Sequence, residues 1–179
     1  MLAHNVAALL KAPPGTNRDI EIFDEHPRFG PEFVTTAAVR GRARLFRTQD
    51  AIVVRGHIDT VIEVECSRCL DPFPFPISMD FEEEFRPSIN ITTGAPLELA
   101  EDEALRIDEH HVLDLTELVR QYLLTNAPLQ PVCSPDCRGL CPTCGADLNE
   151  QACACPSDVD SSPFSALAPL LDRKTTGRS

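Results

Sequence analysis

Two long runs in which apolar and polar residues alternate constrain the fold more than any other feature of the sequence. Within residues 35–47 the odd positions from 39 to 45 are apolar or small, and within residues 52–65 the apolar residues Ile52, Val54, Ile58, Ile62 and Val64 all have even numbers. A period of two residues is typical of strands with one buried face. A turn at Gln49-Asp50 would pair residues whose numbers sum to 99, and this register places both apolar faces on one side. The sequence therefore predicts an antiparallel hairpin.

Further elements follow from shorter patterns. Residues 18–24 alternate and predict another strand, whereas residues 72–81 alternate phenylalanine or other apolar residues with proline, which fits only an edge strand or a segment leaning on the sheet. Apolar residues recur at helical spacing from Leu115 to Leu123, before Pro128. Helices are also expected after Asn5, as a short N-terminal turn, and from Ser162 near the C-terminus.

These elements predict an α+β fold in which a helix packs on an antiparallel sheet of three or more strands. Residues 1–127 would form this domain, including an acidic segment at 80–117. Residues 128–173 would form a cysteine-rich zinc-knuckle segment followed by a C-terminal helix. Residues 174–179 are expected to be a disordered tail, and the length of 179 residues suits one domain with a small appendage.

Acidic residues are concentrated in one segment of the chain. The formal net charge is −12, and residues 80–117 hold 12 acidic and two basic residues. Such a segment is either a solvated surface or a docking surface for a basic partner. The residues proposed for docking are Glu98, Glu101, Asp102 and Glu103.

Arginines form a stripe on the polar face of the predicted hairpin. Arg40, Arg42 and Arg44 occupy every second position, and the predicted register sets Arg55 opposite Arg44. Like charges opposite one another on a sheet are destabilising, so this cluster needs a counterpart. Acidic residues of the same chain and the phosphates of an RNA backbone are both compatible with the pattern.

Eight cysteines indicate a metal site. No secretory signal is recognised in the first ten residues, which disfavours a disulfide framework. In the stretch Cys141-Pro-Thr-Cys144-Gly145 the chain turns tightly enough for two thiolates to reach one tetrahedral zinc ion. Spacing does not decide which two cysteines join this pair, so the structural zinc is expected to take four of six thiolates. The six are Cys133, Cys137, Cys141, Cys144, Cys153 and Cys155.

Cys66 and Cys69 form a separate Cys-x-x-Cys pair. Together with the other six they provide eight thiols, enough for two four-cysteine sites. Two thiols in a tight turn without metal explain this pair equally well. A thioredoxin-like redox role is disfavoured, because no helix pattern begins at Cys66 to lower its pKa.

Motifs of enzymes and membrane proteins are missing from the sequence. It has no glycine-rich phosphate loop, no nucleophile elbow and no His-Glu-x-x-His motif, so we predict a protein without catalytic residues or a small-molecule substrate. The longest apolar run is too short to cross a membrane, and no membrane association is expected.

The order of these motifs resembles the YceD family, also called large ribosomal RNA subunit accumulation proteins. The resemblance rests on Cys66-Ser-Arg-Cys69-Leu70 before the phenylalanine–proline run, on Gly139-Leu-Cys141-Pro-Thr-Cys144-Gly145, and on Ser162-Pro-Phe near the end. It implies a cytoplasmic, non-enzymatic factor in large-subunit biogenesis, and it supplies no catalytic residues. The expected partner is a large-subunit ribosomal protein, bound by the acidic segment, or ribosomal RNA, bound by the arginines. The alternative is a zinc-binding or thiol redox interaction module unrelated to the ribosome.

Overall fold

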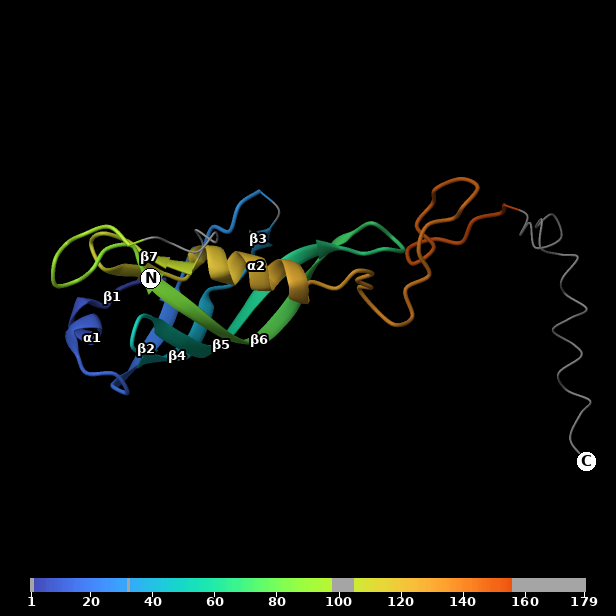
Figure 1. Ribbon diagram of the computed structural model, residues 1–179. Helices are drawn as coiled ribbons and strands as arrows, with labels where there is room; N and C mark the ends of the chain where they lie inside the picture. Colours follow the sequence, from blue (N-terminus) through green and yellow to red (C-terminus); the bar gives the residue numbers. More distant parts are fainter. Residues whose placement is uncertain (1, 32, 98–104, 156–179) are drawn as a thin grey trace, which may run out of the picture.

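The protein is a curled, mixed β-sheet shaped like half a barrel. The computed structural model describes residues 2–31, 33–97 and 105–155. The strands lie in the order β1-β8-β7-β6-β5-β4-β2, and β3 pairs with β5 beside this path (Figure 1). The elements are β1 (Ala3–Asn5), α1 (Ala7–Lys11), β2 (Asn17–Asp24), β3 (Val34–Thr35), β4 (Val39–Arg47), β5 (Ile52–Glu65), β6 (Pro72–Pro87), β7 (Arg106–Ile107), β8 (Val112–Asp114) and α2 (Thr116–Asn126).

The predicted hairpin is formed by β4 and β5 in the predicted register. Arg40 lies opposite Asp59 and Arg44 lies opposite Arg55, so paired residue numbers sum to 99. The Thr48 N–H donates to the Ala51 carbonyl at 3.0 Å and closes the turn. The alternating apolar residues of both strands are buried, which confirms that hydrophobic patterning set this register.

Strand β6 pairs with β5 along its whole length up to Phe85 and forms the long arm seen in Figure 1. Pro72, Pro74 and Pro76 lie where β6 has no second partner strand among the described residues, because β7 pairs with β6 only at Arg86 and Pro87. The prediction of an edge strand for this stretch is confirmed, since proline cannot donate to a second ladder.

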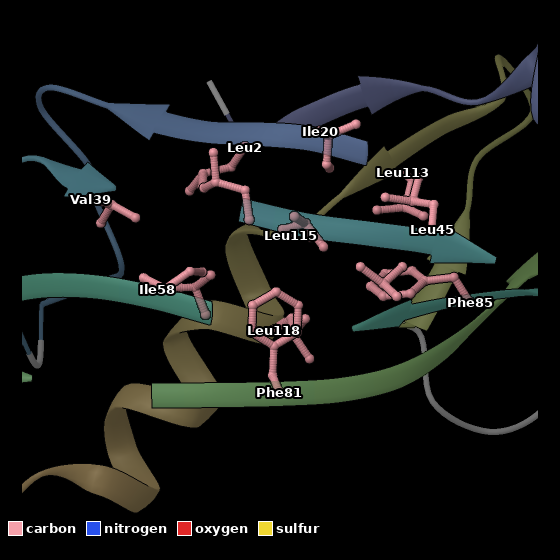
Figure 2. Packing of buried hydrophobic residues seen from close by; sticks show 14 of the residues in the cluster. Leu2, Ile20, Val39, Leu45, Ile58, Phe81, Phe85, Leu113, Leu115 and Leu118 are labelled. Carbon is pink, nitrogen blue, oxygen red and sulfur yellow. The ribbon is translucent and has the colours of Figure 1, made fainter. Parts of the chain in front are cut away.

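The sheet curls around one hydrophobic core. Figure 2 shows Ile58 of β5, Phe81 of β6 and Leu118 of α2 in this core, and all three are buried. The short helix α1 adds Leu9 and Leu10 to the same cluster. Each such side chain contributes about 1.5–3 kcal/mol through burial, so both helices are held by packing rather than by their own propensity.

The predicted fold class, an antiparallel sheet packed by a helix, is wrong. The sheet is mixed, because β6 and β7 pair in parallel, and it is curled into a half-barrel with only two short helices among the described residues. Strands β1, β7 and β8 contain only two or three residues, too few to show a period in the sequence. The expected helix from Ser162 and the tail at 174–179 lie outside the described residues.

Residues 131–155 form an irregular segment after α2, which we call the C-terminal lobe. In Figure 1 this lobe meets the tip of the β5–β6 arm, at the opposite end of the sheet from α1. The only side chains buried in the lobe are those of Cys137 and Cys141. A segment with so little buried apolar surface needs another source of stabilisation.

Candidate metal centres

The first candidate centre begins at the turn between β5 and β6. Cys66 directly follows β5, and its N–H donates to the Asp71 carbonyl at 2.9 Å. The Leu70 N–H donates to the Cys66 carbonyl, also at 2.9 Å, and closes a tight turn. Cys66 and Cys69 are both buried, so the tip of the arm presents two thiols to its interior.

The other half of this centre comes from the C-terminal lobe. The Sγ atoms of Cys66 and Cys137 are 3.8 Å apart, and those of Cys69 and Cys133 are also 3.8 Å apart. A tetrahedral zinc ion with Zn–S bonds of about 2.3 Å holds its sulfurs about 3.8 Å from one another. The spacing therefore fits a four-thiolate metal site. We call Cys66, Cys69, Cys133 and Cys137, whose sulfurs all lie within 4.8 Å of one another, the first centre.

The remaining cysteines form a second group built on the same type of turn. The Gly145 N–H donates to the Cys141 carbonyl at 2.9 Å, which repeats the bond from Leu70 to Cys66. Leu70 and Gly145 also share a left-handed backbone, with φ of 66° and 71°. We call Cys141, Cys144, Cys153 and Cys155, whose sulfurs lie within 4.8 Å of one another, the second centre.

Each centre contains one thiol that ionises readily. A hydrogen bond from the backbone of Cys133 is the main cause that lowers the pKa of Cys66 to about 6. A hydrogen bond from the backbone of Cys144 likewise lowers the pKa of Cys141 to about 6. In the same centre the hydrogen bond with the Cys144 thiol is the main cause that raises the pKa of Cys155 to about 12. One thiolate disfavours ionisation of its neighbours, so four thiolates together require a bound cation.

The structure therefore groups the cysteines in a way that spacing alone left open. Cys141 and Cys144 lie with Cys153 and Cys155, whereas Cys133 and Cys137 join the pair from the arm. All eight cysteines are free thiols. The sequence signal for the first centre was weak because Leu70 stands where a left-handed turn usually has glycine, as Gly145 does in the second.

The predicted arginine stripe lies on the exposed outer face of the sheet, between strands that carry acidic residues. Arg44 Nε lies 2.5 Å from an Asp19 carboxylate oxygen on β2. Arg55 Nη2 lies 2.7 Å from a Glu82 carboxylate oxygen on β6. The register aligns these four residues in one row across four strands. The structure thus supplies acidic counterparts from the same chain for two of the four arginines.

The other two arginines have different surroundings. The Arg40 guanidinium lies 5.4 Å from the centroid of the Phe23 ring, a cation–π geometry. Arg42 is exposed and makes no ion pair with any residue that the structure describes. Opposite Arg42 on β5, the hydrogen bond that the His57 ring donates to the Asp80 carboxylate is the main cause that raises the pKa of His57, and His57 Nδ1 lies 2.8 Å from the carboxylate oxygen.

The acidic residues expected to dock a partner, Glu98, Glu101, Asp102 and Glu103, lie outside the described residues. Within the described part of segment 80–117, exposed acidic residues of β6 pair with basic neighbours. Glu82 pairs with Arg55, and Glu84 lies 2.8 Å from Arg86. Among the described residues, no helix has the length and apolar character needed to cross a membrane.

Fold and site together define a class: a small, β-rich protein with two four-cysteine groups that can each hold a metal ion, one of them shared between a hairpin tip and a C-terminal lobe. The family described as large ribosomal RNA subunit accumulation protein YceD matches residues 54–171, a range that includes the β5–β6 arm, α2 and all eight cysteines. The chain belongs to the YceD family, which confirms the resemblance seen in its motifs.

Relatives are found in plants and in bacteria. The chloroplast protein of Zea mays named large ribosomal RNA subunit accumulation protein YCED homolog 1 is 30% identical, over 78% of this chain and 52% of the maize protein. Its namesake in Arabidopsis thaliana is 22% identical, over 72% and 47%. An uncharacterized protein of Mycobacterium tuberculosis is 30% identical, over 59% and 49%. The chain spans about half the length of these curated relatives, and no solved structure matches it.

Proposed function

We propose that this protein is a non-enzymatic factor in the accumulation of large-subunit ribosomal RNA and acts in the cytoplasm. The observation that supports the proposal is the family match over residues 54–171, which spans both cysteine centres, most of β5 and the strands β6, β7 and β8. Plant relatives in the same family bear names that state this role. The protein would act by binding, through its surface charges.

The proposed partner is a basic ribosomal protein of the large subunit. A net charge of −12 attracts a cationic partner over long distances and repels a polyanion. The pairing of Arg44 and Arg55 with acidic neighbours also reduces the positive field on the outer face. Docking would involve the acidic segment, including Glu98, Glu101, Asp102 and Glu103.

Direct contact with ribosomal RNA is the second candidate, and Arg42 favours it. This arginine is exposed and has no ion pair among the described residues, and it lies between Arg40 and Arg44 along β4. The outer face thus retains one guanidinium that is available to a phosphate without loss of an internal bond.

We also propose zinc as a structural cofactor at both centres. The sulfur spacing of the first centre fits tetrahedral zinc, and four thiolates fill the coordination shell, as in closed structural sites. The C-terminal lobe buries only two cysteine side chains, so metal binding would supply its folding free energy. Elemental analysis of protein purified without added metal should find two zinc ions per chain, and a metal-free folded protein would refute the assignment.

The test of function is complementation. Deletion of the gene should lower the ratio of large-subunit to small-subunit ribosomal RNA, and the wild-type chain should restore it. A variant with Glu98, Glu101 and Glu103 changed to Gln and Asp102 to Asn should fail if the partner is a basic protein. Arg42→Glu should fail instead if the partner is RNA, whereas Lys11→Glu, which reverses an exposed charge in the last turn of α1, serves as the control. An unchanged ribosomal RNA ratio in the deletion strain would overturn the ribosomal role and leave the zinc or redox module.

A further inference from the structure

The two cysteine centres are joined by a very short connection. Only Arg138, Gly139 and Leu140 separate Cys137 of the first centre from Cys141 of the second. The four residue steps from Cys137 to Cys141 span at most about 13–14 Å when fully extended, so neither end can move far without moving the other. The position of a ligand in one centre therefore restricts the position of a ligand in the next.

A side chain from the second centre's loop also reaches a sulfur of the first centre. Asn149, which lies between Cys144 and Cys153 in sequence, donates from Nδ2 to Cys137 Sγ at 3.5 Å. Its Oδ1 accepts the Arg138 N–H at 2.7 Å. Hydrogen bonds of this kind orient metal ligands and stabilise the thiolate form. The loop that holds the second centre is thus bonded to a ligand of the first.

The arm fixes the same connection from the opposite side. Arg68 makes two bonds to this connection. Its backbone carbonyl accepts the Leu140 N–H at 3.0 Å, and its guanidinium donates to the Cys137 carbonyl at 2.8 Å. Gly139 lies against the Arg68 carbonyl, and the Gly139 carbonyl accepts the Leu148 N–H at 2.9 Å. Residues 138–140 are held between the arm and the second loop.

We propose that the two centres take up zinc as one cooperative unit, coupled through Asn149 and residues 138–140. The proposal rests on the zinc binding proposed above and adds how that binding is regulated. Apart from Phe73 and Val132, which pack against cysteines of the first centre, residues 131–155 have no apolar core that would keep one centre assembled while the other is empty. The C-terminal lobe therefore passes from open to fully assembled over a narrow range of free zinc concentration.

Native mass spectrometry of the full chain in buffers of fixed free zinc tests this proposal, because it counts molecules with zero, one and two ions. Half loading is the zinc concentration at which half of all sites are filled. If the two sites are equal and independent, about half of the molecules then carry one ion. If the first ion raises the affinity for the second by about 5–150-fold, this share falls to between about three tenths and about one tenth. We expect the wild-type chain to fall in this lower range.

Asn149→Asp is the sharpest variant. It keeps an acceptor for the Arg138 N–H and removes the donor to Cys137 Sγ and to Asp147 Oδ1. It also adds a negative charge beside the thiolate and the Asp147 carboxylate. The share of singly loaded molecules should rise toward half. Asn149→Ala removes these bonds and the bond from Asn149 Nδ2 to Asp147 Oδ1 at 2.8 Å, without the added charge, and should act in the same direction. Glu150→Gln changes an exposed neighbour and should match the wild type.

The outcomes separate the two proposals. A wild-type chain that binds no zinc overturns zinc binding itself. A chain that binds two ions but shows half of its molecules singly loaded at half loading overturns the coupling and leaves zinc binding intact. Strong coupling that persists in both Asn149 variants overturns the role assigned to Asn149.

Discussion

Replacing Gly139 by alanine should weaken the attachment of the C-terminal lobe to the arm far more than the same change at Gly145. Both glycines have a left-handed backbone, with φ of +70° and +71°. A Cβ at Gly145 would meet nothing within 4 Å. A Cβ at Gly139 would lie 2.8 Å from the carbonyl oxygen of Arg68, which is backbone and cannot swing aside.

The magnitudes follow from these contacts. Alanine in the left-handed region costs about 1–2 kcal/mol, and this is the whole effect expected at Gly145. At Gly139 the clash adds about 1–3 kcal/mol of overpacking. The shift that relieves it breaks the 3.0 Å bond from the Leu140 N–H to Arg68, a loss of about 1 kcal/mol. The total at Gly139 is therefore about 3 kcal/mol or more.

Zinc affinity is the readout, because the lobe folds with its metal and about 1.4 kcal/mol corresponds to a tenfold change in a binding constant. Competition with a colorimetric chelator should show a loss of about 5–30-fold for Gly145→Ala and on the order of 100-fold or more for Gly139→Ala. Hydrogen exchange of the Leu140 amide in the zinc-loaded protein gives a second measure, which needs no chelator. Equal losses in the two variants would refute the contact between lobe and arm.

Three further predictions concern the sheet and the arm. Gly56→Ala should cost about 1–3 kcal/mol in urea unfolding, because its Cβ would lie 2.6 Å from the Phe81 ring; a loss below about 0.5 kcal/mol would contradict this packing. Leu70→Gly should leave the unfolding free energy unchanged or raise it by about 1 kcal/mol, because it relieves a left-handed leucine, and a clear loss would show that the exposed side chain makes a stabilising contact. The bond to Asp80 raises the pKa of His57, so its stabilisation is complete below the ordinary histidine pKa of about 6.5 and is lost as pH rises through the higher folded value. His57→Gln should remove this pH dependence, worth roughly 0.2–1 kcal/mol for so exposed a pair, and identical pH profiles would rule it out.

The hairpin of β4 and β5 could be predicted in detail because its information is local. Each strand is long enough to show its two-residue period. The apolar residues of both strands fall on the same face only if the paired residue numbers have an odd sum. The prolines of β6 predicted its edge position for a similarly local reason, namely the missing N–H.

The mixed topology could not be predicted because its information is not local. The parallel contact joins Arg86 to Arg106 across an acidic stretch, and β7 contains two residues. The grouping of the cysteines was hidden for a related reason. Cys66 and Cys133 are brought together by the arm and the chain after α2, which no spacing rule encodes.

The same long-range pairing changes how the arginine stripe should be interpreted. Along the sequence β4 reads as a positive face, but the fold places Asp19 and Glu21 on one side of it and Asp80 and Glu82 beyond β5 on the other. Each exposed ion pair is worth roughly 0–1 kcal/mol, so these pairs can be exchanged cheaply for contacts to a partner of either sign. These ion pairs reduce the positive electrostatic field that would attract a polyanion from a distance. Long-range attraction therefore follows the net charge of −12 and favours a basic partner, whereas binding of RNA would depend on short-range contacts such as those of Arg42.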